Sequence, residues 1–445
     1  MRRSVRIGSG AGFAGDRLQP AADLAEHGEL DDLVLECLAE RTIALSQAAR
    51  RADPMRGYDQ RLEQRFRTLL PIAARQDLRI ITNMGAANPL AAGARTAGLL
   101  GELGLESRRV AVVTGDDVLS QIDYDAPAFE DGRPLGRHGE IVSANAYLGA
   151  DAILQALETK ADIVITGRVA DPSLFVAPLV DRLGWDLCDW ERIAAATLVG
   201  HLLECAGQVS GGYFADPGYK EIPDLANLGF PFADVSALGA ATLGKWSGSG
   251  GRISVETVRE QLLYEITDPS AYTTPDAVLD IRDVRLQSVA PDRVTVTGAH
   301  GRRRPENLKV SVGYLAGWRA EGEISYFGPH AEARARLAGR IVLTRLKDAT
   351  LKLRAEILSG FTSTLSDVDD SERVPHCRLR IAALGETAQE ADAVCQEVEG
   401  LYTNGPAGGA GVRVHAEDVI GIVSTLIPRD AVVPQVAMME TAHAS

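Results

Sequence analysis

Apolar positions in the first half of the chain form short continuous runs, separated by longer segments with helical spacing. Five of these runs predict strands: Val5–Ser9, Leu33–Leu38, Leu78–Asn83, Val110–Thr114 and Ile163–Thr166. Segments such as Tyr58–Arg75, Pro89–Leu103 and Ala144–Leu157 predict helices between them. Strands without polar alternation are typical of parallel sheets covered on both faces. The pattern therefore predicts an α/β domain with a doubly wound, mostly parallel sheet.

The pattern changes in the second half of the chain. A helix over Val255–Ile266 and a connection over Asp268–Pro275 lead to a strand at Val294–Thr297. From Lys309 we expect the order strand, helix, strand, strand, helix, strand. The expected strands are Lys309–Tyr314, Leu351–Leu358, Cys377–Ala383 and Val419–Leu426, and the expected helices are His330–Leu346 and Ala388–Leu401. Gly322–Gly328 either extends the first of these strands or pairs with it. This is the order of a ferredoxin-like α+β unit, with Ser359–Val374 as a polar surface loop.

The length of the chain indicates two domains, because 445 residues exceed what one hydrophobic core usually supports. We predict an α/β domain for substrate binding and catalysis over residues 1–280, followed by a smaller α+β domain over residues 281–445. An enzyme of this size is also expected to form a homo-oligomer.

Charge and composition argue against several classes of partner. A net charge of −15 opposes polyanions, so we expect no nucleic-acid partner. No apolar run approaches the roughly 18 residues that span a bilayer, so we expect no membrane partner. The five cysteines form no Cys-x-x-Cys pair and are odd in number, which argues against a zinc ribbon and against a disulfide framework. A reducing cytoplasm is the expected location.

The first predicted strand runs into the segment GSGAGFAGDR, residues 8–17. Ligands of parallel α/β sheets bind beyond the carboxyl ends of the strands. Glycines at such an end allow backbone N–H groups to approach an anionic or strongly polar ligand. We therefore expect Gly10, Gly12 and Arg17 to hold an anionic group, with Asp16 as an acid or base. A tight turn without a ligand is the structural alternative.

Other predicted strand ends are also polar. Asn83, Gly85 and Asn88 lie in TNMGAANP, where amides can polarise a carbonyl oxygen or cap the helix that starts at Pro89. Asp116 follows the fourth strand and is a candidate substrate ligand, although two adjacent acids are weak support for a metal site. We expect these segments to meet at one edge of the sheet.

The segment TGRVADPS follows the fifth predicted strand and carries three candidates, Arg168, Asp171 and Ser173. A guanidinium group can clamp a substrate carboxylate, and a carboxylate at a strand end can move a proton or orient water. Ser173 is a candidate substrate-binding hydroxyl. The structural alternative is an internal ion pair between Arg168 and Asp171 that fixes the loop.

A helix predicted over Glu191–Gln208 places His201 and Glu204 on one face, three residues apart. We expect His201 to move a proton and Glu204 to orient it, with Asp16 or Asp171 as the second acid or base. A histidine paired with Glu204 only for structure is the alternative. Three residues at the end of this helix and just after it are candidate substrate contacts: Gln208, Gly211 and Gly212. No His-Glu-x-x-His pattern indicates a metal, and none is expected.

The spacing Gly10-x-Gly12-x-x-Gly15 also matches the dinucleotide fingerprint, which keeps an NAD(P)- or flavin-dependent oxidoreductase open. That motif needs an acid at the end of the second strand. Glu36 lies inside an apolar run, Glu40 comes late, and Asp16 puts a carboxylate where a pyrophosphate would lie.

These segments together resemble the acyclic terpene utilisation (AtuA) family. The matching segments are Gly8–Arg17, Leu38–Thr42, Thr82–Pro89, Ile165–Asp171, His201–Cys205 with Gly211-Gly212, Tyr264–Pro269, Asn404–Gly409 and Leu426–Arg429. The resemblance extends over nearly the whole chain. It implies a branched or carboxylated acyl substrate, including a CoA thioester, in the catabolism of citronellol- and geraniol-type terpenes. It names no catalytic residue.

We therefore predict a cofactor-independent lyase or hydratase, acting by acid/base chemistry on a carboxylated or hydroxylated branched acyl compound. One alternative is a non-catalytic acyl-binding or accessory subunit of an acyl-CoA pathway. The other is the NAD(P)- or flavin-dependent oxidoreductase. All three functions need the polar strand ends to assemble into one pocket.

Overall fold

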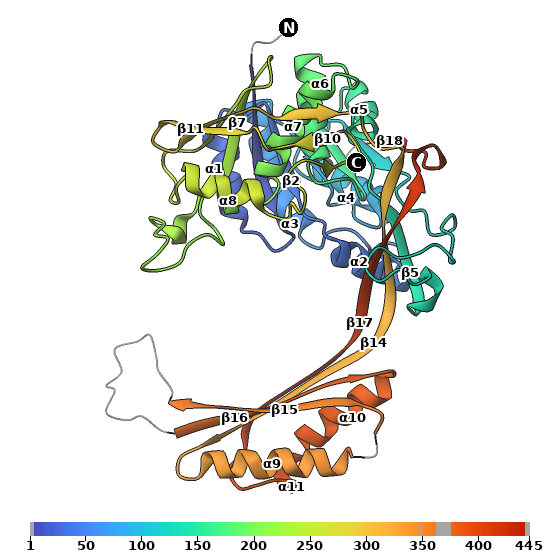
Figure 1. Cartoon of the computed structure of the whole chain (residues 1–445), viewed down its shortest axis with the longest axis vertical. Coiled ribbons are helices and arrows are strands. Elements are labelled where there is room, and N and C mark those ends of the chain that lie inside the picture. The colour runs from blue at the N-terminus through green and yellow to red at the C-terminus, as the bar shows by residue number, and fades with distance from the viewer. Residues whose placement is uncertain (1–3, 348, 362–374, 441–445) are drawn as a thin grey trace. The chain divides into compact units, whose positions relative to one another are not determined.

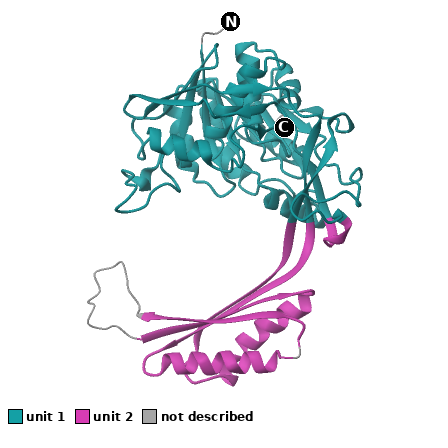
Figure 2. Cartoon of the chain, viewed as in Figure 1, with its two compact units in different colours: residues 1–135, 142–313, 422–445 teal, residues 136–141, 314–421 magenta. Residues whose placement is uncertain are grey.

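The computed structural model describes residues 4–347, 349–361 and 375–440 (Figure 1). Within these ranges the chain has mixed α/β structure, with three sheets and eleven α-helices, which confirms the predicted α/β class. It divides into two compact units (Figure 2). Unit 1 comprises residues 1–135, 142–313 and 422–445, and unit 2 comprises residues 136–141 and 314–421. Residues 281–313 and 422–445 thus group with unit 1, while the domain boundary at residue 280 stays a prediction.

Unit 1 is built on a ten-stranded sheet with the order β11-β12-β8-β7-β1-β2-β3-β6-β4-β18. All five strands predicted in the first half form and pair in parallel at its centre: β1 (Ser4–Gly12), β2 (Asp32–Glu36), β3 (Arg79–Thr82), β6 (Ile163–Thr166) and β4 (Val110–Thr114). The outer strands pair antiparallel: β7 (Pro231–Ser236), β8 (Ala241–Lys245), β12 (Arg293–Thr297), β11 (Arg285–Ala290) and β18 (Gln435–Met439). The sheet is therefore parallel only in its middle.

Helices cover both faces of this sheet. Three of them, α1 (Leu18–His27), α3 (Leu62–Gln76) and α4 (Pro89–Glu102), share a buried core with Leu33 and Ile80 of the central strands. The neighbouring strand residues Val34 and Ile81 are equally buried and point to the other face. Four more helices follow strands or loops of unit 1: α2 (Glu40–Ala52), α5 (Ala150–Glu158), α6 (Ser173–Leu183) and α7 (Trp190–Leu203), of which α5, α6 and α7 contact the sheet. The helix α8 (Val255–Leu263) packs against α7.

Two segments of unit 1 differ from the sequence-based expectation. Residues Ala144–Leu157 do not form one helix, because Glu140–Ala146 forms strand β5, which pairs with β14, and α5 begins only after Gly149. The stretch Asp268–Pro275 is more than a connection, because Tyr272–Thr273 forms β9 of a small sheet with β10 (Val278–Asp280) and β13 (His300–Arg302). Tertiary strand pairing, which local spacing does not reveal, decides both segments.

Unit 2 contains a sheet in the order β15-β16-β14-β17. Its elements are β14 (Asn307–Phe327), α9 (Ala331–Arg345), β15 (Lys352–Phe361), β16 (Pro375–Gly385), α10 (Ala388–Glu399), α11 (Leu401–Asn404) and β17 (Ala410–Pro428). Strand β14 is continuous, so Gly322–Gly328 extends Lys309–Tyr314 and does not pair with it. The predicted loop Ser359–Val374 falls from residue 362 onward outside the described residues. Along the described ranges, no helix combines the length and the apolar character needed to cross a membrane.

Candidate functional site

Arg168, just beyond β6, lies at the centre of a buried polar cluster. Its side chain is 1% exposed, and its Nη2 donates to Asp171 Oδ1 at 2.5 Å. Its Nη1 donates to the carbonyl of Leu38, and the guanidinium carbon lies 4.2 Å from the centroid of the Tyr147 ring. Among the described residues its Nε has no hydrogen-bond partner. The structure thus contains the Arg168–Asp171 ion pair, and both terminal nitrogens of the arginine are engaged.

Asp116 fixes the segment that carries Arg168. Its carboxylate accepts from the Arg168 backbone N–H at 2.9 Å and from Asn145 Nδ2 at 2.8 Å. Burial raises the pKa of Asp116 to about 6. A Cβ on Gly167 would lie 2.4 Å from Asp116 Oδ1, so only glycine fits there. In this structure Asp116 therefore positions the arginine.

Asn83 holds a second buried carboxyl group, that of Glu36 at the end of β2. Its Nδ2 donates to Glu36 Oε1 at 2.8 Å, and its Oδ1 accepts from the Cys37 N–H at 2.7 Å. Burial raises the pKa of Glu36 more strongly than the nearby Arg168 lowers it. Because both ends of the Asn83 amide are engaged, this residue positions Glu36 within the cluster.

The neighbouring candidates Gly85 and Asn88 have structural roles. A Cβ on Gly85 would lie 2.4 Å from the carbonyl oxygen of Thr166, so the two backbones approach too closely for a side chain. Asn88 caps α4 through a 3.4 Å bond from the Ala91 N–H, and its Nδ2 donates to two backbone carbonyls. These contacts are those of the helix cap that the sequence left open as an alternative.

His201 and Glu204 form the pair that their spacing predicts. His201 Nδ1 lies 3.0 Å from Glu204 Oε1, and His201 Nε2 lies 3.2 Å from the carbonyl oxygen of Leu262. The His201 side chain is 1% exposed and the Glu204 side chain 9%. Glu204 Oε2 is buried without a hydrogen-bond partner among the described residues. Both ring nitrogens of the histidine are therefore engaged, while one oxygen of the glutamate is free.

Burial and pairing act in opposite directions on this pair. Burial lowers the pKa of His201. The hydrogen bond with Glu204 and the charge of Glu204 raise that pKa by more than burial lowers it, so the pKa is above its usual value. Burial also raises the pKa of Glu204, against the lowering effect of His201. Protonated His201 can donate on both sides, to Glu204 and to the Leu262 carbonyl.

Three carboxyl groups, those of Glu36, Asp171 and Glu204, act on one another in this cluster. Burial raises the pKa of each of them, and the charges of Glu36 and Glu204 raise that of Asp171 further against the effect of Arg168. Because the negative charge of one such carboxyl group opposes the ionisation of another, the three groups cannot all ionise freely. They therefore share protons. The Asp171 side chain keeps 35% of its surface exposed, so it is the accessible member of the cluster.

The glycine segment after β1 packs against the end of α7. A Cβ on Gly12 would lie 2.3 Å from the Cys205 carbonyl carbon and 2.5 Å from the Glu204 carbonyl oxygen. The Gly12 N–H donates to Asp16 Oδ2 at 2.8 Å, and burial raises the pKa of Asp16. The amide that a pyrophosphate would take is thus already occupied by a carboxylate. The segment fits a dinucleotide poorly for this reason.

A cavity of about 420 Å³ lies beside this segment. Its polar lining consists of five candidates and a cysteine: Gly12, Asp16, Arg17, Cys205, Gln208 and Gly212. Its apolar lining consists of Phe13, Pro20, Tyr213, Leu225, Leu228 and Phe230, of which Phe13, Tyr213 and Leu225 are exposed. Arg17 Nη1 donates to the carbonyl of Ala226 at 2.6 Å. The cavity thus combines a polar wall with an apolar rim.

Three further candidates lie elsewhere in unit 1. A Cβ on Gly10 would meet Leu33 and Leu35 of the core at 3.1–3.3 Å, so this glycine packs against β2. Gly211 has φ +115° in a turn next to Ile222. Ser173 is fully buried at the start of α6, and its hydroxyl donates to Asp276. The sequence did not reveal these local roles.

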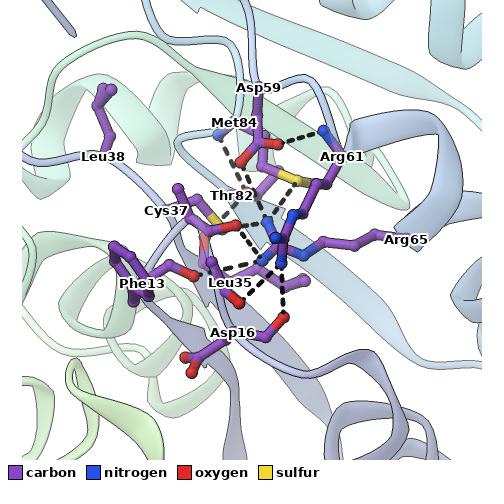
Figure 3. Close-up of polar contacts among 12 residues, drawn as sticks. Phe13, Asp16, Leu35, Cys37, Leu38, Asp59, Arg61, Arg65, Thr82 and Met84 are labelled. Atoms are coloured by element: carbon purple, nitrogen blue, oxygen red, sulfur yellow. Dashed lines mark hydrogen bonds and ion pairs between the residues drawn. The ribbon is translucent and has the colours of Figure 1, made fainter. Parts of the chain in front are cut away.

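Arg65 of α3 is a site residue that the sequence analysis missed (Figure 3). Its Nη1 pairs with Asp59 Oδ2 at 3.1 Å and donates to Cys37 Sγ at 2.9 Å. Its Nη2 donates to the carbonyl oxygens of Ala14 at 2.9 Å and Phe13 at 3.3 Å. Arg65 therefore ties the glycine segment to the end of β2. No sequence motif signals this role, because the contacts join four separate segments.

No metal centre is evident in the described part of the chain, where no group of three or more His, Cys, Asp and Glu side chains is arranged to hold an ion. All five cysteine thiols are free. The site therefore consists of carboxyl, imidazole, phenol and guanidinium groups.

The family model for "Acyclic terpene utilisation family protein AtuA" matches residues 5–438. The match spans both compact units. No curated protein matches the chain.

Proposed function

This chain belongs to the acyclic terpene utilisation family AtuA, and on that premise we propose that it is a cofactor-independent lyase or hydratase. It acts by acid/base chemistry on a hydroxylated or carboxylated branched acyl compound, which can be carried as a CoA thioester. The observation that carries this proposal is the unpartnered Glu204 Oε2. Glu204 is held beside His201, and its charge acts on the accessible Asp171.

The geometry favours Glu204 as the group that moves the proton, with His201 as a positioning residue. His201 has no free nitrogen, whereas Glu204 has a free oxygen and a raised pKa. A raised pKa increases the share of the acid form of Glu204 at any given pH, which suits a group that gives and takes a proton. This assignment reverses the roles expected from the sequence.

Two carboxyl groups are sufficient for an elimination of water. One carboxylate takes the proton from the carbon next to a carbonyl group, and the other, as the acid, gives its proton to the departing hydroxyl. The C–H and C–O bonds break, a C=C bond forms, and water leaves. Glu204 and Asp171 supply these groups, and Arg168 holds Asp171 in place. The reverse sequence hydrates the double bond.

The apolar rim of the cavity supports a branched acyl chain as part of the substrate. Exposed apolar side chains gathered at a cavity usually mark a binding surface. Phe13 and Tyr213 are 64% and 89% exposed at this rim. An accessory subunit that binds an acyl ligand without turning it over would use the same rim, and this observation keeps that alternative in place.

The test is turnover of branched enoyl and hydroxyacyl thioesters by the purified chain, followed by mass spectrometry as gain or loss of water. We expect Glu204→Gln to lower the rate by about 10²–10⁴, the usual contribution of a general acid or base. Glu265→Gln is the matched control, because Glu265 is an exposed neighbour whose charge reaches Glu204. Equal rates for the wild type and Glu204→Gln would refute the role of Glu204.

Four finer assignments accompany this proposal. The helices on both faces of the parallel strands support a doubly wound description of unit 1, and the order β15-β16-β14-β17 supports a ferredoxin-like description of unit 2. The free cysteines support a cytoplasmic location. A homo-oligomer rests on what is usual for enzymes.

A further inference from the structure

We propose that Tyr272, Asp171 and Glu204 form a subsite for an uncharged hydroxyl or carbonyl group of the substrate, and that this subsite rejects a carboxylate. The inference rests on the proposed function, whose substrate can be either carboxylated or hydroxylated. At the reacting end of the substrate, the inference favours an uncharged hydroxyl or carbonyl group over a carboxylate. Tyr272 lies in the segment that the sequence presented only as a connection.

Tyr272 is placed by β9 and by the histidine beneath it. The centroids of the Tyr272 and His201 rings are 5.2 Å apart, with the rings tilted by 54°. The side chain is partly exposed, and within the described residues its hydroxyl has no hydrogen-bond partner. Burial raises the pKa of this hydroxyl, and the negative charges of Glu204 and Asp171 raise it further. Because Tyr272 is partly exposed and none of the described groups bonds to its O–H, this donor is available to a ligand.

Glu204, which bonds to the histidine next to the Tyr272 ring, has a second unused hydrogen-bonding group. Its side chain is nine-tenths buried, its Oε1 is taken by His201, and its Oε2 is unpartnered among the described residues. Leaving a buried polar atom without a partner destabilises the protein. A ligand group that pairs with this oxygen removes that cost. Asp171, 35% exposed, gives access to the cluster from solvent.

The charges at this subsite oppose an anion. Glu36, Glu40, Asp171 and Glu204 all act on Arg168 or on one another. Among the described residues three cations face them, and each is already paired with one of these carboxyl groups: Arg168 with Asp171, Lys309 with Glu40, and His201, when protonated, with Glu204. Both terminal nitrogens of this arginine are already engaged, and its side chain is 1% exposed. An incoming carboxylate would therefore meet several like charges and, in the described part of the chain, no unpaired cation.

A hydroxyl group satisfies the same atoms in either protonation state of Glu204. It can donate to an ionised Glu204 or accept from a protonated one, and it can also accept from the Tyr272 O–H. A carbonyl oxygen fits the protonated state in the same way. Sites built to hydrogen-bond an uncharged group reject analogues that leave their polar atoms unpaired. The subsite is therefore specific for an uncharged oxygen.

The probes are a branched, saturated alcohol of monoterpene size and the carboxylic acid of the same carbon skeleton, titrated into the full chain at neutral pH by calorimetry. We expect the alcohol to bind at least about tenfold more tightly. Tyr272→Phe removes only the hydroxyl and should weaken alcohol binding about tenfold, the usual worth of one hydrogen bond. Tyr219→Phe, at an 81% exposed tyrosine that does not line the cavity, should change it less than about twofold.

Asp171→Asn provides an independent readout, because removing one negative charge should raise the affinity for the carboxylate. Tighter binding of the carboxylate by the wild type, equal effects of the two tyrosine variants, or binding of neither probe would overturn the inference. Failure of the inference is distinguishable from failure of the proposed function. If the chain turns over a thioester but prefers the carboxylate probe, the proposed function stands and the subsite is wrong. If the chain binds the alcohol selectively but turns over no thioester, the subsite stands and the proposed function is wrong.

Discussion

Replacing Arg65 by methionine removes the positive charge at the centre of the contacts in Figure 3 while keeping an unbranched side chain. The variant leaves Asp59, whose side chain is 6% exposed, without its ion-pair partner. It also removes the donors to the Ala14 and Phe13 carbonyl oxygens, which lie at 2.9 Å and 3.3 Å from Nη2. The perturbation therefore acts on a buried charge and on the glycine segment together.

The expected cost follows from the burial of the pair. Removing one partner of a buried ion pair costs about 3–5 kcal/mol, because the other charge is left uncompensated. The Arg61 N–H still donates to Asp59 at 2.6 Å, so we expect the lower part of this range. Arg67→Met is the matched control two residues along the same helix. Arg67 is 43% exposed, and its partners Glu63 and Glu102 keep their bonds to Arg95, so we expect a loss of at most about 1 kcal/mol.

The assay is urea unfolding followed by circular dichroism, with both variants and the wild type compared at the same pH. We expect a clear shift of the midpoint for Arg65→Met and almost none for Arg67→Met. The double variant Arg65→Met/Asp59→Asn should recover part of the loss, since it no longer buries an unpaired charge. Equal midpoints for the two arginine variants would refute the reasoning that the buried pair organises this region.

Two further predictions concern stability. Asp276 has a pKa raised by burial to about 6, above its usual value of 3.8. Protonation of Asp276 therefore stabilises the fold at low pH, and this contribution is lost as the pH rises from about 4 to about 6. It amounts to at most about 3 kcal/mol of the free energy of unfolding. Asp276→Asn should remove this pH dependence, which thermal unfolding measured across the same pH range would show. Gly12→Ala should lower the melting temperature because its Cβ would lie 2.3 Å from the Cys205 backbone, whereas Gly98→Ala in α4, where the nearest atom is the flexible end of Arg95 at 3.6 Å, should raise it slightly. Similar shifts for both glycine variants would contradict the close contact at Gly12.

The central strands of unit 1 could be predicted because each is a continuous apolar run that needs no partner to be recognised. Strand β5 could not, because Ser143 and Asn145 are buried through contacts with distant segments. The same limit applies to β18, which pairs with β4 from the far end of the sequence. Elements whose burial depends on long-range pairing carry no local signature.

The candidate site shows the same division. His201 and Glu204 were predictable as a pair from their spacing on one helix, and their contact is present at 3.0 Å. Tyr272 and Arg65 were not, since each reaches the site from a segment with no motif. The sequence suggested His201 as the proton carrier, but it could not show that the Leu262 carbonyl occupies the second ring nitrogen. Chemistry can be read from residue types, but the free atom that performs it depends on tertiary contacts.

The double anchoring of His201 has a consequence for how the site responds to solution conditions. An imidazole bonded at both ends cannot rotate, and to lose its proton it must first give up one of two tight contacts in a dry interior. The rate of the chain should then follow the ionisation of oxygen acids, and reagents that acylate histidine should leave the folded protein active. Chemical modification of histidines would therefore not reveal the proposed catalytic site around Glu204.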